Sequence, residues 1–470
     1  MVEVPAPGPS GGQVLLETTR TLVSLGTEKM LMDFGKAGWI AKARQQPDKV
    51  KQVLGKMKVD GLFATVDAVR SKLSKPIPLG YCNVGLVARG GSEKYPKGSR
   101  VASNGNHAEV VSVPENLCAR IPDEVSDETA TFTVVGAIGL QGIRLLEPTL
   151  GEKVVVMGLG LIGLLTVQML KANGCQVLGV DVDPEKCALA KSFGAEVCDL
   201  SKGGDALAAA ENFSNGDGVD GVLITASAKT DQIVHEAATM CRKRGRIVLV
   251  GVVGLKLQRD DFYKKELSFQ VSCSYGPGRY DPQYEDKGVD YPLPFVRWTE
   301  QRNLETVLCL MAEGKIITDP LVSHRFSFDD ALEAYKVVGS GKALGVILDY
   351  GLPQGVDSSK FARTLEIHSE NNALEHPGVS FIGAGNFTAR NLLPAIEKVG
   401  KAKLRMIVSK RGSSSGQVGQ QFGFEKAGSD VGEVFSISHV IVYDLGSIDE
   451  YVYIQIIKLL DIIISKYYNM

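Results

Sequence analysis

Residues 152–183 decide the fold, and they read EKVVVMGLGLIGLLTVQMLKANGCQVLGVDVD. The apolar run 154–157 predicts a short strand that is buried on both faces of a parallel sheet. Residues 158–163 then match the pattern G-x-G-x-x-G, and a helical pattern continues after them. A second apolar run ends in Asp181, about 20 residues past the glycines, where an acid can hydrogen-bond a ribose 2′-hydroxyl. This order of strand, glycines, helix, strand and acid predicts a dinucleotide-binding unit.

Each glycine of this turn has its own expected role. Gly158 permits the tight turn, Gly160 lets the backbone approach a pyrophosphate, and Gly163 lets the helix pack close to the strand. The first helical residues, Leu161 and Ile162, would offer free backbone N–H groups and the positive end of the helix dipole to the phosphates.

The acid at the end of the second strand decides between the two nicotinamide coenzymes. A carboxylate at Asp181 would repel a 2′-phosphate, so we expect NAD rather than NADP at this first site. The alternative is a glycine-rich turn in some other α/β fold. A lone glycine motif would leave that alternative strong, whereas the full series of elements in order weakens it.

Composition limits the class of protein. A chain of 470 residues is long enough for two or three domains, and 52 basic residues against 54 acidic ones favour neither nucleic acid nor an anionic membrane as a partner. The eight cysteines are scattered without a C-x-x-C pair, which is typical of reduced thiols in a cytoplasmic protein. No signal sequence and no clean stretch of about 18 apolar residues is present. We expect a soluble enzyme with a small-molecule substrate, and a homo-oligomer is compatible with these features.

The patterns around the nucleotide unit predict an α/β chain of several parts. Residues 1–135 and 295–350 carry short strands between Gly and Pro turns, which predicts a small, partly closed β domain. Residues 136–294 alternate strand and helix signals, which predicts a doubly wound parallel sheet. Residues 29–75 form a basic, helical insertion that is either solvated surface or a grip for an anionic substrate. Residues 351–376 look like a linker.

A second nucleotide-binding pattern opens the C-terminal part, residues 377–470. The stretch 379–390 reads VSFIGAGNFTAR, in which Thr388 stands where the third glycine would be. The next expected strand ends in Ser-Lys-Arg at 409–411, and this basic pair would suit the 2′-phosphate of NADP. A Rossmann-like turn that binds nothing is the alternative. The residues that would contact a nucleotide here are Gly383, Gly385 and Asn386.

The loop 272–280, SCSYGPGRY, follows another expected strand of the nucleotide unit. Open α/β sheets bind ligands at that edge of the sheet. Arg279 could pair with a phosphate or carboxylate of the substrate, and Tyr275 would add an aromatic surface. The alternative is an ordinary Gly-Pro turn with exposed aromatic residues.

The order of β domain, G-x-G-x-x-G unit and return segment resembles the medium-chain alcohol dehydrogenase family over residues 1–350. That resemblance implies a GroES-like catalytic domain, an NAD-binding Rossmann domain, and hydride transfer to or from an alcohol or carbonyl carbon. Residues from about 377 resemble the opening of the glucose–fructose oxidoreductase and inositol dehydrogenase family. Together they look like bi-domain oxidoreductases that are often associated with surface-polysaccharide gene sets, which implies a sugar or nucleotide-sugar substrate.

The resemblance also exposes a departure at the positions of the family's zinc ligands. Leu25 stands where a cysteine ligand is expected, Tyr81 replaces the histidine, and Val134 falls near the third ligand. The four-cysteine structural lobe is absent as well. A catalytic zinc needs three protein ligands and an open position, so we expect no metal in this site.

Without a Lewis acid, hydride transfer needs another group to handle the proton on the substrate oxygen. The resemblance aligns Thr27 with the hydroxyl that relays this proton, and it places Tyr81 where a ligand would face the substrate. Glu28 and His107 are further polar residues in turns of the same domain. We therefore treat these four residues as catalytic candidates, against the alternative of ordinary structural hydrogen bonding.

The two ends of the chain depart from both families. The opening lacks a first strand or two, and the last residues, EYVYIQIIKLLDIIISKYYNM, resemble no part of the expected C-terminal domain. We expect a truncated, incomplete second Rossmann-like domain. Two other functions stay open: a quinone or enoyl reductase, which also needs no zinc, and a non-catalytic scaffold that binds nucleotide.

Overall fold

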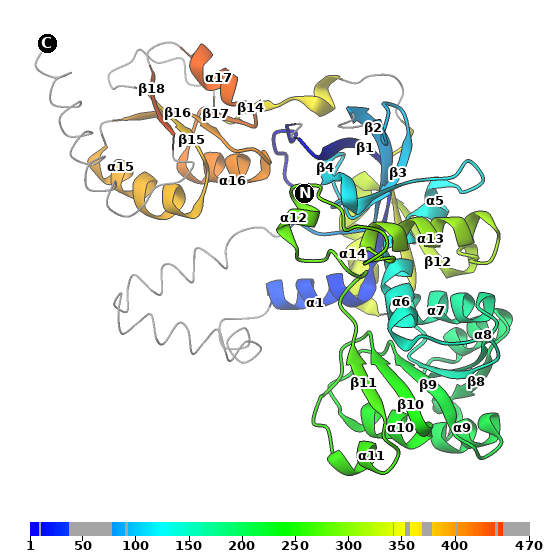
Figure 1. Cartoon of the computed structure of the whole chain (residues 1–470). Helices are drawn as coiled ribbons and strands as arrows, with labels where there is room; N and C mark the ends of the chain where they lie inside the picture. Colours follow the sequence, from blue (N-terminus) through cyan, green and yellow to red (C-terminus); the bar gives the residue numbers. More distant parts are fainter. Residues whose placement is uncertain are drawn as a thin grey trace, which may run out of the picture.

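The computed structural model describes residues 1–8, 11–36, 78–89, 93–341, 343–352, 358–368, 378–400, 402–437 and 440–444. Their strands form three sheets, which Figure 1 shows as separate blue-yellow, green and orange groups. Of the expected basic, helical insertion at 29–75, only the start is described, as the end of α1 (Leu25–Lys36). No described helix is both long and apolar enough to cross a membrane.

The first sheet joins strands from both sides of the nucleotide unit. Its order is β12-β13-β1-β2-β3-β5, with β4 also paired to β1, so the return segment completes the N-terminal strands. The proposed domain boundaries at residues 135 and 295 remain a prediction. They require strands from before and after the nucleotide unit to share one sheet, as these strands do. The strands are β1 (Gln13–Ser24), β2 (Asn83–Arg89), β3 (Arg100–Ser103), β4 (Val110–Pro114), β5 (Cys118–Arg120), β12 (Val322–Ser327) and β13 (Gly345–Asp349).

The second sheet is parallel throughout, with the order β11-β10-β9-β6-β7-β8. The chain runs outward from β6 through β7 and β8, then returns to the other side of β6 at β9. Ligands bind at such a reversal of strand order in open α/β sheets. The strands are β6 (Lys153–Met157), β7 (Gln176–Asp181), β8 (Glu196–Asp199), β9 (Val219–Ile224), β10 (Cys241–Leu249) and β11 (Ser268–Val271). The helices that pack beside them are α7 (Leu161–Ala172), α8 (Pro184–Ser192), α9 (Ala206–Ser214), α10 (Gln232–Met240) and α11 (Arg259–Tyr263).

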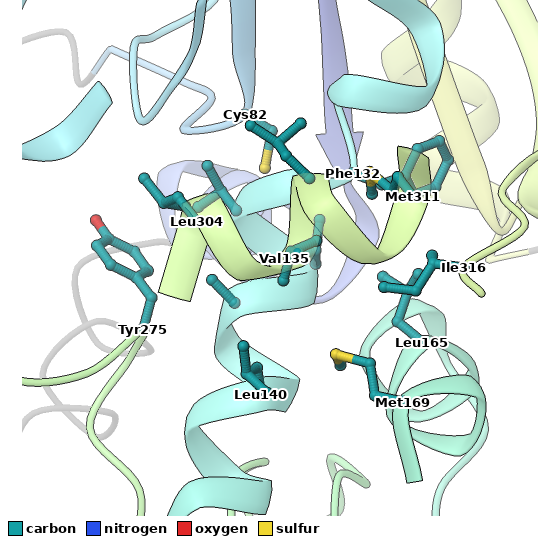
Figure 2. Packing of buried hydrophobic residues seen from close by; sticks show 14 of the residues in the cluster. Cys82, Phe132, Val135, Leu140, Leu165, Met169, Tyr275, Leu304, Met311 and Ile316 are labelled. Atoms are coloured by element: carbon teal, nitrogen blue, oxygen red, sulfur yellow. The ribbon is translucent and has the colours of Figure 1, made fainter. Parts of the chain in front are cut away.

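One apolar core connects these two sheets through α6 (Thr133–Leu146) and α13 (Glu300–Ala312). Figure 2 shows the core around α6, from Cys82 and Phe132 to Leu165 and Met169 on α7, with Tyr275 at one side. Helix α6 contacts β3 of the first sheet and β9 and β10 of the second, so the β domain and the nucleotide unit pack against the same helix. The remaining elements here are α5 (Asp127–Ala130), α12 (Pro282–Glu285), α14 (Ala331–Ser340) and the 3-10 turns η1 (Glu115–Leu117), η2 (Leu200–Lys202), η3 (Asp319–Leu321) and η4 (Phe328–Asp330).

The third sheet has the order β14-β17-β16-β15-β18, in which only β14 is antiparallel to its neighbour. The expected linker at 351–376 is therefore wrong in part, because residues 364–366 form a strand of this sheet. The elements are η5 (Ser358–Phe361), β14 (Thr364–Glu366), β15 (Gly378–Ile382), η6 (Thr388–Leu392), α15 (Leu393–Val399), β16 (Lys403–Val408), α16 (Ser413–Phe422), β17 (Lys426–Gly428), α17 (Val431–Ser436) and β18 (Val440–Asp444). The apolar tail at 450–470 lies outside the described residues.

The opening segment, residues 1–8, lies against the third sheet rather than forming part of the first one. The Ala6 N–H donates to the Ala362 carbonyl at 2.9 Å, and the Ser429 hydroxyl donates to the Ala6 carbonyl at 2.5 Å. A Cβ atom added at Gly412 would overlap the Pro5 carbonyl oxygen. The first residues of the chain therefore close one flank of a sheet formed hundreds of residues later.

Candidate active site

The glycine turn after β6 has the geometry that a nucleotide phosphate needs. Gly158 has a φ of 99°, and a Cβ there would come within 2.6 Å of the Ala226 backbone nitrogen. A Cβ at Gly163 would overlap the Gly158 carbonyl oxygen, so only glycine lets α7 start this close to the strand. A Cβ at Gly160 would meet no atom within 4 Å, which leaves open space on the side where a pyrophosphate would approach.

The first turn of α7 offers its backbone rather than its side chains. Gly160 is the N-cap residue and makes no side-chain cap hydrogen bond, so no side chain at that position competes for the N–H groups of the first turn. Leu161 is buried and Ile162 is half-buried against the core. Their side chains hold the helix, while their N–H groups are the expected phosphate ligands.

The acid at the end of β7 is fixed beside this turn. Asp181 Oδ2 accepts the Leu159 N–H at 2.6 Å, and Oδ1 accepts the Asp183 N–H at 2.9 Å. The carboxyl group is partly exposed at the carboxyl edge of the parallel sheet. Its position next to the glycines is the one expected for a residue that binds the adenosine ribose.

The loop after β11 joins the nucleotide unit to the first sheet. The Asn104 amide donates to the Tyr275 hydroxyl at 3.2 Å, and the Asn303 amide donates to the Tyr275 carbonyl at 2.9 Å. Tyr275 is buried in the shared core, where Figure 2 places it near Leu304 of α13. Tyr275 therefore links the loop after β11 to residues of the first sheet and of α13, and its ring is buried rather than exposed to a substrate.

Arg279 is engaged within its own loop, and the pairing with a substrate anion expected of it stays a prediction. Its guanidinium forms an ion pair with Glu285, and its carbon Cζ lies 4.3 Å from the centre of the exposed Tyr280 ring. The partner carboxylate lies only six residues further along the chain. A substrate anion would have to compete with this built-in ion pair.

A buried hydrogen-bond network lies at the start of α1. Glu28 is fully buried, and its Oε1 accepts the Ser24 N–H at 2.8 Å, as a carboxyl group near a helix start commonly does. Its Oε2 lies 3.1 Å from His107 Nε2 and accepts the hydroxyl of Tyr335. Three donors thus satisfy a carboxyl group that would otherwise be costly to bury.

This network reaches the other candidate residues of the sequence. The half-buried Tyr81 donates its hydroxyl to Ser24 Oγ at 2.7 Å, and His107 Nδ1 lies 2.7 Å from Thr21 Oγ1. Thr27 lies within α1, and its side chain is outside the described residues. The side chains of Glu28 and His107 are both buried within this network, and their catalytic roles stay a prediction.

The three aligned ligand positions carry no zinc-binding atoms in this arrangement. Leu25 packs in the apolar cluster of α14 and β13, and Val134 is buried in the main core. Tyr81 is bonded to Ser24. Across the described ranges, no three His, Cys, Asp or Glu side chains are grouped to hold a metal.

Sequence reasoning missed an isolated buried acid, Glu300, at the start of α13. It is fully buried, and neither of its oxygens has a hydrogen-bond partner in the described structure. Burial raises the pKa of the Glu300 carboxyl to about 9, the charge of Glu285 adds to the rise, and Arg279 opposes it. The nearest sequence signal is the N-cap residue Thr299, which indicates a helix start but does not indicate that Glu300 is buried.

The second glycine turn, after β15, has a related but different geometry. Gly383 has a φ of 108°, and a Cβ at Gly385 would meet nothing within 4 Å. Thr388, in the place of the third glycine, donates its hydroxyl to the Gly383 carbonyl at 2.8 Å. The exposed Asn386 begins the helical segment, which continues as the π-helical turn η6. Lys410 and Arg411 are exposed in the turn after β16.

Comparisons with solved structures agree with this fold. Galactitol-1-phosphate dehydrogenase from Escherichia coli aligns with a TM-score of 0.56 and 19% identity, covering 74% of this chain and 95% of the other. An alcohol dehydrogenase from Thermus sp. ATN1 gives a TM-score of 0.55 at 19% identity over the same shares. The expected combination of a GroES-like domain with a Rossmann domain is thereby confirmed, because both neighbours have the alcohol dehydrogenase fold.

Comparisons of sequence identify the class more closely. Residues 162–286 match the family model described as zinc-binding dehydrogenase. The (R,R)-butanediol dehydrogenase of Bacillus subtilis is 28% identical over 232 residues, 49% of this chain and 59% of that protein. An alcohol dehydrogenase of Rhizobium meliloti is 25% identical over 325 residues, 67% of this chain and 92% of that protein. Residues 162–286 are therefore similar to zinc-binding dehydrogenases, and the chain is similar to alcohol dehydrogenases over a longer stretch.

These comparisons correct one expectation. The cofactor set without zinc is contradicted, because the model that matches residues 162–286 is that of zinc-binding dehydrogenases. The replacements at Leu25, Tyr81 and Val134 and the missing four-cysteine lobe were too narrow a basis for excluding the metal from the protein.

Proposed function

We propose that the protein is an NAD(P)-dependent oxidoreductase that acts on CH–OH groups. The observation that carries this proposal is the glycine turn 158–163 at the reversal of strand order, with Asp181 fixed beside it. Its relatives include a butanediol dehydrogenase and a galactitol 1-phosphate 5-dehydrogenase of Escherichia coli, the latter 27% identical over 255 residues. Both names describe oxidation of a hydroxyl-bearing carbon.

We further propose that the coenzyme is NAD. The Asp181 carboxyl group lies where the adenosine ribose would bind, and a negative charge there repels a 2′-phosphate. No basic side chain occupies the adjoining position 182, which is an exposed valine. The preference for NAD over NADP therefore rests on one carboxyl group.

In this proposal the reaction takes a hydride and a proton from a secondary or primary alcohol. A nicotinamide coenzyme held at the 158–163 turn and Asp181 would supply the hydride acceptor for the carbinol carbon, and the protein would have to accept the proton from the hydroxyl oxygen. In its deprotonated, phenolate form the Tyr81 oxygen is the candidate acceptor for that proton, which would restore the phenol, since the side chain is half-buried and aligned by Ser24. In the reverse direction its O–H would donate to the carbonyl oxygen. Thr27 is the second candidate, at the aligned relay position.

The substrate class that we propose is a polyol, sugar or nucleotide-sugar derivative. The D-xylulose reductases and galactitol 1-phosphate dehydrogenases among the relatives act on polyhydroxylated molecules by name. We also keep the proposal that residues 377–470 derive from a glucose–fructose oxidoreductase-type module. The order β17-β16-β15-β18 with a glycine turn after β15 supports it.

The test is coenzyme binding by calorimetry to the full chain and to Asp181→Ala. Wild-type protein should bind NAD at least about 10-fold more tightly than NADP. Loss of hydrogen bonds from a charged group costs about 1.5–3 kcal/mol, so Asp181→Ala should bind NAD roughly 10- to 100-fold more weakly and lose its preference. Turnover is then followed as NADH formation on a panel of polyols and sugars.

The outcomes separate the competing functions. Failure of wild-type protein to bind either coenzyme would refute the assignment. Binding without turnover on any alcohol, but with oxidation of NADH by enones or quinones, would favour the reductase instead.

A further inference from the structure

Tyr335 is the part of the Glu28 network that no sequence pattern indicated. It lies on α14 in the return segment, and its hydroxyl donates to Glu28 Oε2. Helix α14 contributes to the same apolar cluster as Leu25 and Met32 of α1. The two helices are therefore packed together, and the Tyr335 hydroxyl is held opposite the carboxyl group by that packing.

Tyr335 can only be a donor in this arrangement. Burial, the charge of Glu28 and the hydrogen bond to it all raise the pKa of the Tyr335 phenol, so the O–H keeps its proton. The same Glu28 oxygen lies 3.1 Å from His107 Nε2, and the rings of His107 and Tyr335 meet edge-on with their centroids 6.3 Å apart. Tyr335 and His107 thus hold one carboxyl oxygen from two sides.

Two routes lead from this carboxyl group to Tyr81. On the first route, Glu28 Oε1 accepts the Ser24 N–H, and Ser24 Oγ accepts the Tyr81 hydroxyl. On the second, the His107 ring packs directly beneath Gly80, where a Cβ would lie 2.6 Å from the imidazole. The backbone N–H of His107 also donates to the Leu79 carbonyl at 2.8 Å. The side chain and the backbone of Tyr81 are both supported by the Glu28–His107 pair.

We propose that Tyr335 is a positioning residue of the active site, which fixes the Glu28–His107 pair and through it the Tyr81 hydroxyl. The inference rests on the proposed function, because Tyr81 is the group that would exchange a proton with the substrate. Helix α14, from the return segment, would thereby help to position the side chains of the site.

The experiment compares Tyr335→Phe with the matched control Tyr95→Phe in the full chain. Tyr95 is fully buried and Tyr335 partly buried, but the Tyr95 hydroxyl donates at 2.6 Å to the Cys118 carbonyl, away from Glu28. The protein is labelled with ¹⁵N-histidine, and the imidazole signals of His107 are assigned among the six histidines with His107→Gln. Tyr81→Phe gives the reference for loss of the reacting hydroxyl itself.

Tyr335→Phe should shift the His107 imidazole signals and lower kcat roughly 10-fold or more, with KM for NAD unchanged, because displaced groups slow the chemical step. Tyr95→Phe should do neither. An unmoved His107 signal, or equal kcat losses in both variants, would overturn the inference while leaving the proposed function intact. Wild-type protein without turnover would instead refute the proposed function, and the positioning role of Tyr335 with it.

Discussion

The two glycine turns of this chain solve one packing problem in two ways. In both, the carbonyl of the first glycine accepts a hydroxyl hydrogen bond: Gly158 from Thr225, at the end of β9, and Gly383 from Thr388, within the following helix. At the first turn the third position is Gly163, and α7 starts in contact with the turn. At the second turn Thr388 takes the third position, and the helical segment that begins at Asn386 continues as the wider π-helical η6.

The difference shows what the third glycine contributes. When it is present, the helix N-terminus comes close to the turn, and a neighbouring strand supplies the hydroxyl that satisfies the carbonyl. When it is replaced by threonine, the turn satisfies its own carbonyl, and the following segment contains a π-helical turn. The strand that follows each turn differs as well. Strand β7 ends in Asp181, whereas β16 is followed by Ser409 and two exposed basic residues.

The largest expected effect is that of Gly163→Ala, which tests whether close packing is what defines the first turn. The new methyl group would overlap the Gly158 carbonyl oxygen, so α7 must move away from β6. We expect a loss of about 3 kcal/mol or more in the free energy of unfolding, and loss of measurable NAD binding. Urea unfolding and calorimetry measure the two effects.

Gly160→Ala is the matched control, because its methyl group would meet nothing within 4 Å in the free protein. It should leave stability nearly unchanged and weaken only coenzyme binding. Equal losses of stability in the two alanine variants would show that the turn does not depend on the close approach at Gly163.

A smaller expected effect is a pH dependence of stability that comes from Glu300, in the dehydrogenase-like part of the chain, and not from the third sheet. The pKa of Glu300 is raised from 4.5 to about 9 in the folded protein. Its contribution to stability is therefore greatest below pH 4.5, and it is lost as the pH rises toward 9, by about 1.4 kcal/mol for each pH unit. Glu300→Gln should remove this slope, so the variant gains stability over wild type between pH 6 and pH 9.

Thermal unfolding at several pH values measures that gain. Among the described residues of the third sheet, the buried polar side chains are serine and threonine, with no buried carboxyl group. A transition that belongs to the third sheet should therefore not respond to Glu300→Gln. A stability difference between variant and wild type that is constant with pH would contradict the assignment of a raised pKa to Glu300.

The smallest expected effect is that of Thr388→Gly, which gives the second turn the missing glycine. The variant loses one hydrogen bond to the Gly383 carbonyl and adds a flexible residue to a helix, which together cost about 1–2 kcal/mol. NAD binding at the first turn should not change. Thr388→Ser keeps the hydroxyl and should recover most of the loss, and destabilisation by both variants alike would mean that the methyl group, not the hydroxyl, holds the turn.

The sequence predicted the first turn and its sheet well because each signal is local. Strand, glycines, helix and acid lie within 152–183, and their order alone places Asp181 at the carboxyl edge. The Glu28 network could be predicted only in part. Tyr335 lies more than 300 residues from its carboxyl partner, and no periodicity links the two. The strand at 364–366 was missed because it is short and half-polar, so its turn-rich surroundings dominated the pattern.

The contact between the chain's opening and the third sheet bears on how the protein can be divided for study. A fragment that starts after residue 352 would lack the segment at Ala6 and Gly8, and it would leave the Ser429 hydroxyl and the Gly412 surface uncovered. Such a fragment should express poorly on its own. Grafting residues 1–8 onto it through a short Gly-Ser tether is the way to obtain the module in isolation.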